Sequence, residues 1–354
     1  MVTKKSSVGG QAVIEGVMMR GCAGVATAVR KEDGEIEVSL EEMIPFTKRN
    51  RLFGLPIIRG FISLIDSLVV GIKTLNYSAS FFEEETEVSG FDKWFQGVFK
   101  EKSNDIIIGI SLVLSLIFSV LIFFILPTFA ANIFKRFNVV SGTIGLNIIE
   151  GIIRVAIFLV YIYLIGKMED INRVFQYHGA EHKSIFCYEN EGELTPENAK
   201  KFGRLHPRCG TNFMFLVMIV SIILFSLTGW KSIWQRILYR VILLPIVSGV
   251  TYEMIKWMGK SDSALSRGLA YPGLMLQKLT TREPDLDQLE VAIKALKKAE
   301  GIEEPKVEEV EIDKGVVEVN EIDNVDSAEE LIVCEEVKEE NFEVVEEEDK
   351  SIEL

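Results

Sequence analysis

Four long apolar segments constrain this chain of 354 residues more than any other feature of its sequence. They cover residues 105–126, 143–166, 211–230 and 236–258. An α-helix needs roughly 20 mostly apolar residues to cross the hydrocarbon core of a bilayer, and each segment is long enough. Buried helices of a large soluble protein are the alternative, but helices that are apolar on every face have few uses there. The sequence therefore predicts an α-helical polytopic membrane protein with four transmembrane helices.

Lysine and arginine residues predict how these segments are oriented. Seven of them lie between the second and third segments, in residues 167–210, and others follow the fourth segment. Because cytoplasmic loops carry the excess of basic residues, we expect a multi-pass protein of the cell membrane. Residues 167–210 and both the N- and C-termini are then cytoplasmic. The basic start of the chain is followed by no apolar stretch, so we expect no signal peptide.

A small cytoplasmic β element is expected near the N-terminus, within residues 1–54. Alternating apolar residues flank Asp33-Gly34, and this pattern predicts a β hairpin. The residues concerned are Val25, Thr27 and Val29 against Ile36, Val38 and Leu40.

Residues 55–104 are expected to form an amphipathic helix and a linker. The helix is apolar but carries Arg59, Asp66 and Lys73, whose spacing of seven places them on one helical face. Three charged residues make a membrane span improbable, so we expect a helix that lies in the cytoplasmic interface. Packing of this helix against the spans is the alternative.

Two further segments follow the last span. Residues 259–302 are expected to be a cytoplasmic helical segment, because apolar residues recur at helical spacing after the start signal Pro284-Asp285. Residues 303–354 hold 22 acidic and 4 basic residues, a net charge of −18, and this density predicts an acidic disordered tail. With −14 for the whole chain, residues 1–302 carry +4, which suits a protein beside anionic lipid.

All three histidines of the chain lie close together in the sequence, at His178, His182 and His206. On a helix, His178 and His182 share a face and can hold one metal ion. With Glu181 they also match the inverted zincin pattern, in which two histidines bind zinc and the glutamate acts as a base. We therefore expect a divalent metal site, with zinc as the metal and Glu181 as the catalytic residue.

Two sets of further ligands are compatible with the sequence. Inverted zincins use a distant glutamate as third ligand, and Glu253 near the cytoplasmic end of the last span is the candidate. Alternatively, His206 and Cys209 have the short spacing of metal-binding knuckles. The first set leaves an open coordination position and favours catalysis. The second closes the coordination shell and favours a structural role.

Charged residues also occur inside the predicted spans. Glu150 and Arg154 lie four apart in the middle of the second span, and Arg240 lies in the fourth. Ionisable groups at such positions are costly and are usually paired or functional. We expect an ion pair between Glu150 and Arg154, to which Arg240 contributes; a role in transport is the alternative.

Four longer motifs resemble a known family. They are GGQAVIEGVMMRG near the start, YHGAEHKSIFCYE and LHPRCGTNF in the middle, and LTTREPDLDQLEVAI near the end. On these motifs the chain is similar to the YqhQ-like family of bacterial membrane proteins over residues 8 to 298. That family is commonly labelled as a metal-dependent enzyme, with no named substrate or reaction. The resemblance implies metal-linked activity at His178, His182, His206 and Cys209.

Two functions of different classes are open at this point. The first is a metal-dependent hydrolase that acts at the cytoplasmic face on a peptide or lipid-linked substrate. The second is a non-enzymatic membrane scaffold or assembly factor with a structural metal or none. The expected partners are the lipid bilayer and either a membrane protein or a lipid-linked molecule. No nucleic-acid-binding motif is recognisable, and the sequence indicates no oligomeric state.

Overall fold

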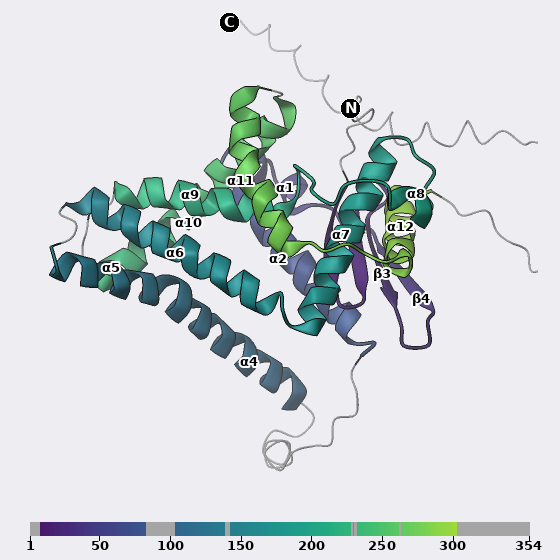
Figure 1. Ribbon diagram of the computed structural model, residues 1–354, viewed down its shortest axis with the longest axis horizontal. Helices are drawn as coiled ribbons and strands as arrows, with labels where there is room; N and C mark the ends of the chain where they lie inside the picture. Colours follow the sequence, from purple (N-terminus) through teal and green to yellow (C-terminus); the bar gives the residue numbers. More distant parts are fainter. Residues whose placement is uncertain are drawn as a thin grey trace, which may run out of the picture. The chain divides into compact units, whose positions relative to one another are not determined.

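A computed structural model describes residues 8–82, 103–138, 142–227, 229, 232–261 and 263–302 of the chain. The predicted acidic tail, residues 303–354, lies outside the described residues, as do residues 83–102 of the predicted linker. Helices predominate, and a small antiparallel sheet stands near the N-terminus (Figure 1).

The N-terminal sheet has four strands, where the sequence predicted a hairpin. Its strands are β1 (Gly9–Val13), β2 (Gly16–Arg20), β3 (Val25–Arg30) and β4 (Ile36–Glu41), in that order and all antiparallel. The predicted hairpin is β3 with β4, and Gly34 turns the chain at φ 88°. Its register differs from the expected one: Ala26 and Ala28 pair with Leu40 and Val38, whereas Thr27 pairs with Ser39 and Val29 with Glu37. The two additional strands come from the glycine-rich motif at residues 9–21, whose alternation is weak.

Both faces of the sheet are covered, which explains why β3 is buried along almost its whole length. Met18 and Val25 pack on one face against Val70 of α2 (Ile58–Ala79). On the same face, Arg20 forms an ion pair of 2.9 Å with Asp66. The opposite face packs against α7 (Glu169–Glu189) and α12 (Leu286–Glu300). The sheet is therefore the middle layer between helices, and its strands need not alternate between apolar and polar residues.

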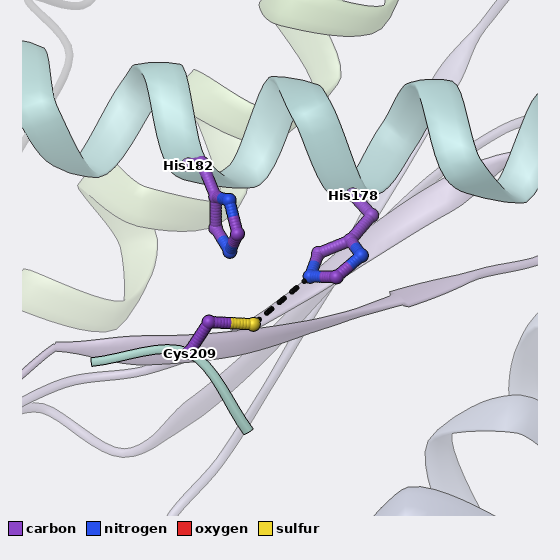
Figure 2. Close-up of side chains that lie close together, drawn as sticks. All are labelled: His178, His182 and Cys209. Carbon is purple, nitrogen blue, oxygen red and sulfur yellow. Dashed lines mark hydrogen bonds between the residues drawn. The ribbon is translucent and has the colours of Figure 1, made fainter. Parts of the chain in front are cut away.

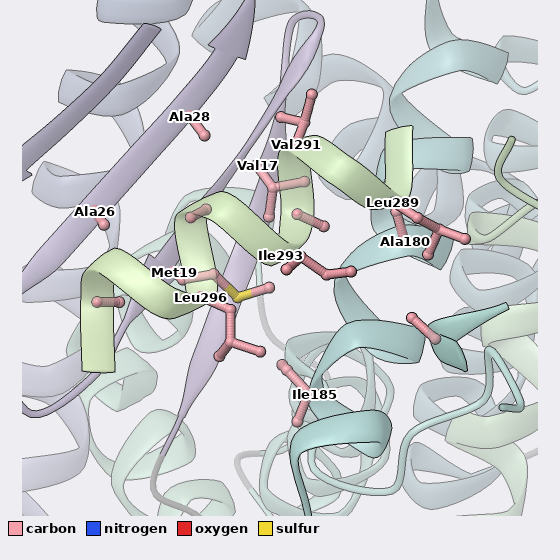
Figure 3. Packing of buried hydrophobic residues seen from close by; sticks show 14 of the residues in the cluster. Val17, Met19, Ala26, Ala28, Ala180, Ile185, Leu289, Val291, Ile293 and Leu296 are labelled. Carbon is pink, nitrogen blue, oxygen red and sulfur yellow. The ribbon is translucent and has the colours of Figure 1, made fainter. Parts of the chain in front are cut away.

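Helix α12 provides more residues of the main core than any other element (Figure 3). Asp285 and Gln288 form a capping box at its start, and Gly301 ends it in the left-handed conformation. Leu289, Ile293 and Leu296 are buried, as their helical spacing predicts, against β2, β3 and α7.

Three helices are long and apolar enough to cross a membrane among the residues that the structure describes. They are Val113–Arg136, Thr143–Ile165 and Trp234–Lys260. The first joins α4 (Ser103–Val120), a π-helical turn η3 (Leu121–Ile125) and α5 (Leu126–Arg136). It runs past its predicted end at residue 126, because Pro127 lies in the first turn of α5, just after the π-helical turn, and does not end the helix there. The second is α6 (Thr143–Ile165), and the third is α10 (Ile233–Lys260) without its first residue.

The predicted span at residues 211–230 is shorter than expected. It forms α9 (Gly210–Ser226), whose 17 residues extend about 26 Å against a hydrocarbon thickness of ~30 Å. The helix ends at Ser226, and Gly229 then adopts φ 82°, which is not helical. The structure thus supports three candidate spans, and the count of four stays a prediction.

Helix α2 packs against α10, one of the three candidate spans, which was the alternative to a helix in the interface. The contact is close because glycines meet in it: a Cβ at Gly60 would lie 2.6 Å from Cβ of Tyr252. A Cβ at Gly249 would collide with the backbone carbonyl of Ile57. Small residues of this kind allow backbones to approach closely in membrane helix pairs. The position of α2 relative to the membrane interface stays a prediction.

The segment at residues 167–210 is largely helical. It contains α7 and α8 (Pro196–Ala199), and Lys183 of α7 donates hydrogen bonds to the carbonyls of Lys200 and Phe202. Helix α11 (Ala264–Thr280) packs against α9. The remaining described elements are α1 (Phe46–Arg49) and η1 (Arg51–Gly54).

Truncation of a core residue of α12 tests this packing. We expect Leu296→Ala to lower the free energy of unfolding by about 2–5 kcal/mol, because it leaves a cavity between the sheet and α7. Leu286→Ala on the same helix is the matched control, since Leu286 is 39% exposed. Thermal unfolding of both variants in detergent checks the difference. Equal shifts would contradict the packing of α12.

Candidate metal centre

Helix α7 positions the candidate ligands His178 and His182. The helix begins with Glu169 and Asp170, whose negative charges suit a helix N-terminus. Both histidines lie on the side of the helix that faces the start of α9, where Cys209 occupies the N-cap position (Figure 2). Their imidazole rings are in edge contact, with centroids 4.5 Å apart.

Two imidazoles and one thiol converge at this place. One nitrogen each of His178 and His182 and the sulfur of Cys209 lie within 4.8 Å of one another. His178 Nε2 is 3.2 Å from Cys209 Sγ. From the lengths of Zn–N and Zn–S bonds, tetrahedral coordination places such a nitrogen and sulfur about 3.5 Å apart. The spacing therefore fits a zinc site with three protein ligands.

Backbone carbonyls hold both rings in the orientation that ligation requires. His178 Nδ1 lies 2.9 Å from the carbonyl oxygen of Thr280, and His182 Nδ1 lies 2.5 Å from that of Arg204. A carbonyl oxygen only accepts, so Nδ1 carries the hydrogen and donates in each case. The lone pair of Nε2 then remains available on each ring. Metal-bound histidines almost always donate their other nitrogen in this way.

Unpaired polar atoms at the centre also fit a bound cation. His182 Nε2 and Glu181 Oε2 are buried and lack a hydrogen-bond partner among the residues that the structure describes. Such atoms are costly unless something satisfies them. Burial lowers the pKa of His182, which favours the neutral imidazole that a metal needs.

Glu181 lies on the same helix and is almost fully buried. Burial raises the pKa of Glu181, whereas His178, His206 and a hydrogen bond from the Gly10 backbone act in the opposite direction. A Cβ at Gly10 would lie 3.0 Å from Cδ of Glu181 and 2.6 Å from the Met18 carbonyl oxygen. Strand β1 can therefore cover Glu181 only because residue 10 is glycine.

His206 is close to the centre but is oriented toward other partners. Its ring centroid is 5.7 Å from that of His182, and its Nε2 lies 3.4 Å from a carboxylate oxygen of Glu189. Its Nδ1 accepts a hydrogen bond from the backbone N–H of Arg208. Burial lowers the pKa of His206 to about 4, so the ring is neutral at physiological pH. The structure does not bring it into the group of three ligand atoms.

Glu253, the other candidate ligand, is engaged elsewhere. Arg59 of α2 donates two hydrogen bonds to its carboxylate, at 2.6 and 2.5 Å. This pair joins α2 to α10. Of the ligands considered from the sequence, the structure thus groups His178, His182 and Cys209, with Glu181 beside them.

Residues that hold the ligands in place were not identified from the sequence. Gln277 of α11 accepts from the backbone N–H of His206 at 2.8 Å and donates to its carbonyl at 2.7 Å. A Cβ at Gly179 would collide with the carbonyl of Arg282, and Arg282 N–H donates to the carbonyl of Phe175. Gly179 and Arg282 lie in the long motifs quoted from the sequence, whereas Gln277 lies outside them and carried no signal.

Comparisons with known proteins identify the family to which the chain belongs. Residues 55–301 match the family model described as "Protein of unknown function (DUF1385)". The chain is 36% identical over 298 residues to "Uncharacterized protein YqhQ" of Bacillus subtilis (strain 168), a match that covers 81% of this chain and 90% of that protein. No solved structure matches the chain. The chain therefore belongs to the YqhQ-like family, whose function is unknown.

Proposed function

We propose that this protein is a membrane-embedded, metal-dependent hydrolase whose centre lies at the cytoplasmic face of the cell membrane. The observation that carries the proposal is the grouping of His178, His182 and Cys209 within 4.8 Å, with Glu181 beside them. Catalytic zinc sites use three protein ligands and keep a fourth position open, whereas structural sites are closed by four. A set of three ligands therefore favours catalysis.

The chemistry of the proposed site divides between metal and protein. A bound divalent ion, for which zinc suits two imidazoles and a thiolate, would act as a Lewis acid toward a carbonyl or phosphoryl oxygen. Glu181 would accept and return a proton at its unpaired oxygen, as a general base does. The substrate class that we propose is a peptide or lipid-linked molecule, because the ligand Cys209 starts the apolar helix α9.

The proposed topology has both termini in the cytoplasm. The basic residues of segment 167–210 and of the segment after α10 support it. This topology requires that α9 cross the membrane together with the three longer helices. Local thinning of the bilayer or flanking residues would then compensate for the short length of α9.

A structural metal in a non-enzymatic scaffold is the second candidate. The burial of the centre favours it, since His182 is 1% and Glu181 4% exposed. In this case Cys209 and the histidines would tie the start of α9 to α7, and the carboxylate of Glu181 would have no chemical task. The role of Glu181 therefore separates the two candidates.

Metal content tests the ligand set. We expect protein purified in detergent without chelator to contain stoichiometric zinc, and His178→Ala and Cys209→Ala to lose it, because two ligands hold zinc weakly. Glu253→Gln is the control that retains the metal, since its carboxylate pairs with Arg59. Elemental analysis by mass spectrometry measures each protein. Wild-type protein free of metal, or loss of zinc in Glu253→Gln alone, would refute this ligand set.

Substitution of the proposed base tests catalysis. We expect Glu181→Gln to keep its zinc and its thermal stability but to lose hydrolysis by a factor of about 10²–10⁴, the usual contribution of a general base. Zinc-loaded protein in liposomes, assayed against fluorogenic peptides, esters and phosphodiesters, provides the measurement. Asp170→Asn, at the exposed start of the same helix, is the control for charge loss. Full activity of Glu181→Gln would favour the structural metal.

A further inference from the structure

A run of exposed residues connects the N-terminal sheet to helix α2. Every residue from 48 to 58 is exposed, and this run contains most of α1 and η1. Large apolar side chains are frequent in it, although they face outward. They are Leu52 (63% exposed), Phe53 (37%), Leu55 (45%), Ile57 (42%) and Ile58 (44%). Apolar side chains that gather on a surface in this way mark an interaction site for a membrane or another partner.

The same run is basic. Lys48, Arg49 and Arg51 belong to it, and residues 43–65 contain no acidic side chain. None of these three side chains forms an ion pair with a residue that the structure describes. The guanidinium group of Arg49 lies over the ring of Phe46, 4.7 Å from its centroid. We call residues 48–58 the basic-apolar segment.

Basic residues inside the candidate spans are, by contrast, paired within the protein. Glu150 of α6 forms ion pairs with Arg154 of its own helix, at 2.8 Å, and with Arg236 and Arg240 of α10. The predicted pairing of Glu150 with Arg154 and Arg240 is thus confirmed. Arg240 also packs over the ring of Phe225, at the end of α9. These arginines have a carboxylate partner, which the basic-apolar segment lacks among the described residues.

The fold holds the basic-apolar segment near one end of a candidate span. Arg59, which follows the segment directly, pairs with Glu253 of α10. From Glu253 the helix continues for about 10 Å to its end at Lys260. This last part contains Lys256 and Trp257, and Trp257 is 43% exposed. Tryptophan and lysine are typical of the membrane interface, so the segment lies near the level at which α10 would leave the hydrocarbon core.

We propose that the basic-apolar segment binds the anionic lipid surface of the membrane in which the chain is embedded. Its apolar side chains enter the boundary of the acyl chains, and Lys48, Arg49 and Arg51 bind phospholipid phosphates. An anionic lipid surface presents apolar groups and negative charge side by side, which complements both properties of the segment. Helix α2 packs on α10, so the segment before α2 makes this contact. The metal centre does not contribute to the binding.

Photo-crosslinking of the full-length protein in vesicles tests this binding. The vesicles contain equal amounts of neutral phosphatidylcholine and anionic phosphatidylglycerol, and p-benzoylphenylalanine replaces Phe53. Mass spectrometry identifies the molecules that become attached on irradiation. We expect lipid adducts in which phosphatidylglycerol exceeds phosphatidylcholine at least about fivefold, the effect of one basic residue near an anionic surface. No lipid adduct, equal amounts of the two lipids, or attachment to a protein chain in place of lipid would overturn the proposal.

Removal of the basic side chains locates the preference for anionic lipid. In the triple variant Lys48→Gln/Arg49→Gln/Arg51→Gln, we expect position 53 to form lipid adducts without an excess of phosphatidylglycerol. The unsubstituted charges at about 1 M sodium chloride, where the Debye length is about 3 Å, should give the same result. This second measurement decides the matter should the triple variant fail to fold. An undiminished excess under either condition would contradict the proposal.

Two controls accompany these measurements. Lys200→Gln/Lys201→Gln/Lys298→Gln removes an equal charge from exposed positions beside α8 and on α12, and should keep the excess of phosphatidylglycerol at position 53. The crosslinker in place of Phe118, which is 64% exposed on α4, should attach to both lipids equally. Loss of the excess in the Lys200, Lys201 and Lys298 variant, or an equal excess at position 118, would show that the preference does not belong to the basic-apolar segment and would overturn the proposal.

Discussion

The candidate centre depends on two segments that approach α7 very closely, one at each of two glycines. Gly179 admits the carbonyl of Arg282, and Gly10 admits the carboxylate-bearing side chain of Glu181. A side chain at either position would displace a neighbouring segment. The first displacement would move Thr280, whose carbonyl orients His178, and the second would lift β1 from Glu181. Two glycines, Gly179 on α7 and Gly10 on β1, therefore set how closely neighbouring segments approach the ligands.

The candidate centre also joins the sheet-containing region to the apolar helix α9. Cys209 is the residue from which α9 starts, and the two histidines belong to a helix that packs on the sheet. The start of α9 is itself held by α11, where Gly273 makes room for Asn212. A metal ion shared by these ligands would resist separation of the two regions, whether or not it also takes part in catalysis.

The two buried polar clusters illustrate different solutions to the cost of burial. At the candidate metal centre, burial lowers the pKa of both His182 and His206 and so favours neutral rings. At the other end of α9, arginines remain charged because guanidinium groups do not lose their protons in proteins. Glu150 forms ion pairs with all three of them, Arg154, Arg236 and Arg240, and this shared carboxylate lowers the cost of burying their charges.

The sequence by itself determined the apolar helices, the β3–β4 hairpin, α12 with its caps, and the closeness of His178 to His182, because each depends on periodicity or spacing within one segment. It did not determine that His206 turns toward Glu189, that Glu253 pairs with Arg59, or that Arg236 joins Glu150. The sequence also did not predict β1 and β2, and it predicted a longer helix than the observed α9. Only the tertiary structure decided these points, because they depend on which of several chemically suitable partners, remote in the sequence, packing brings within a few ångströms.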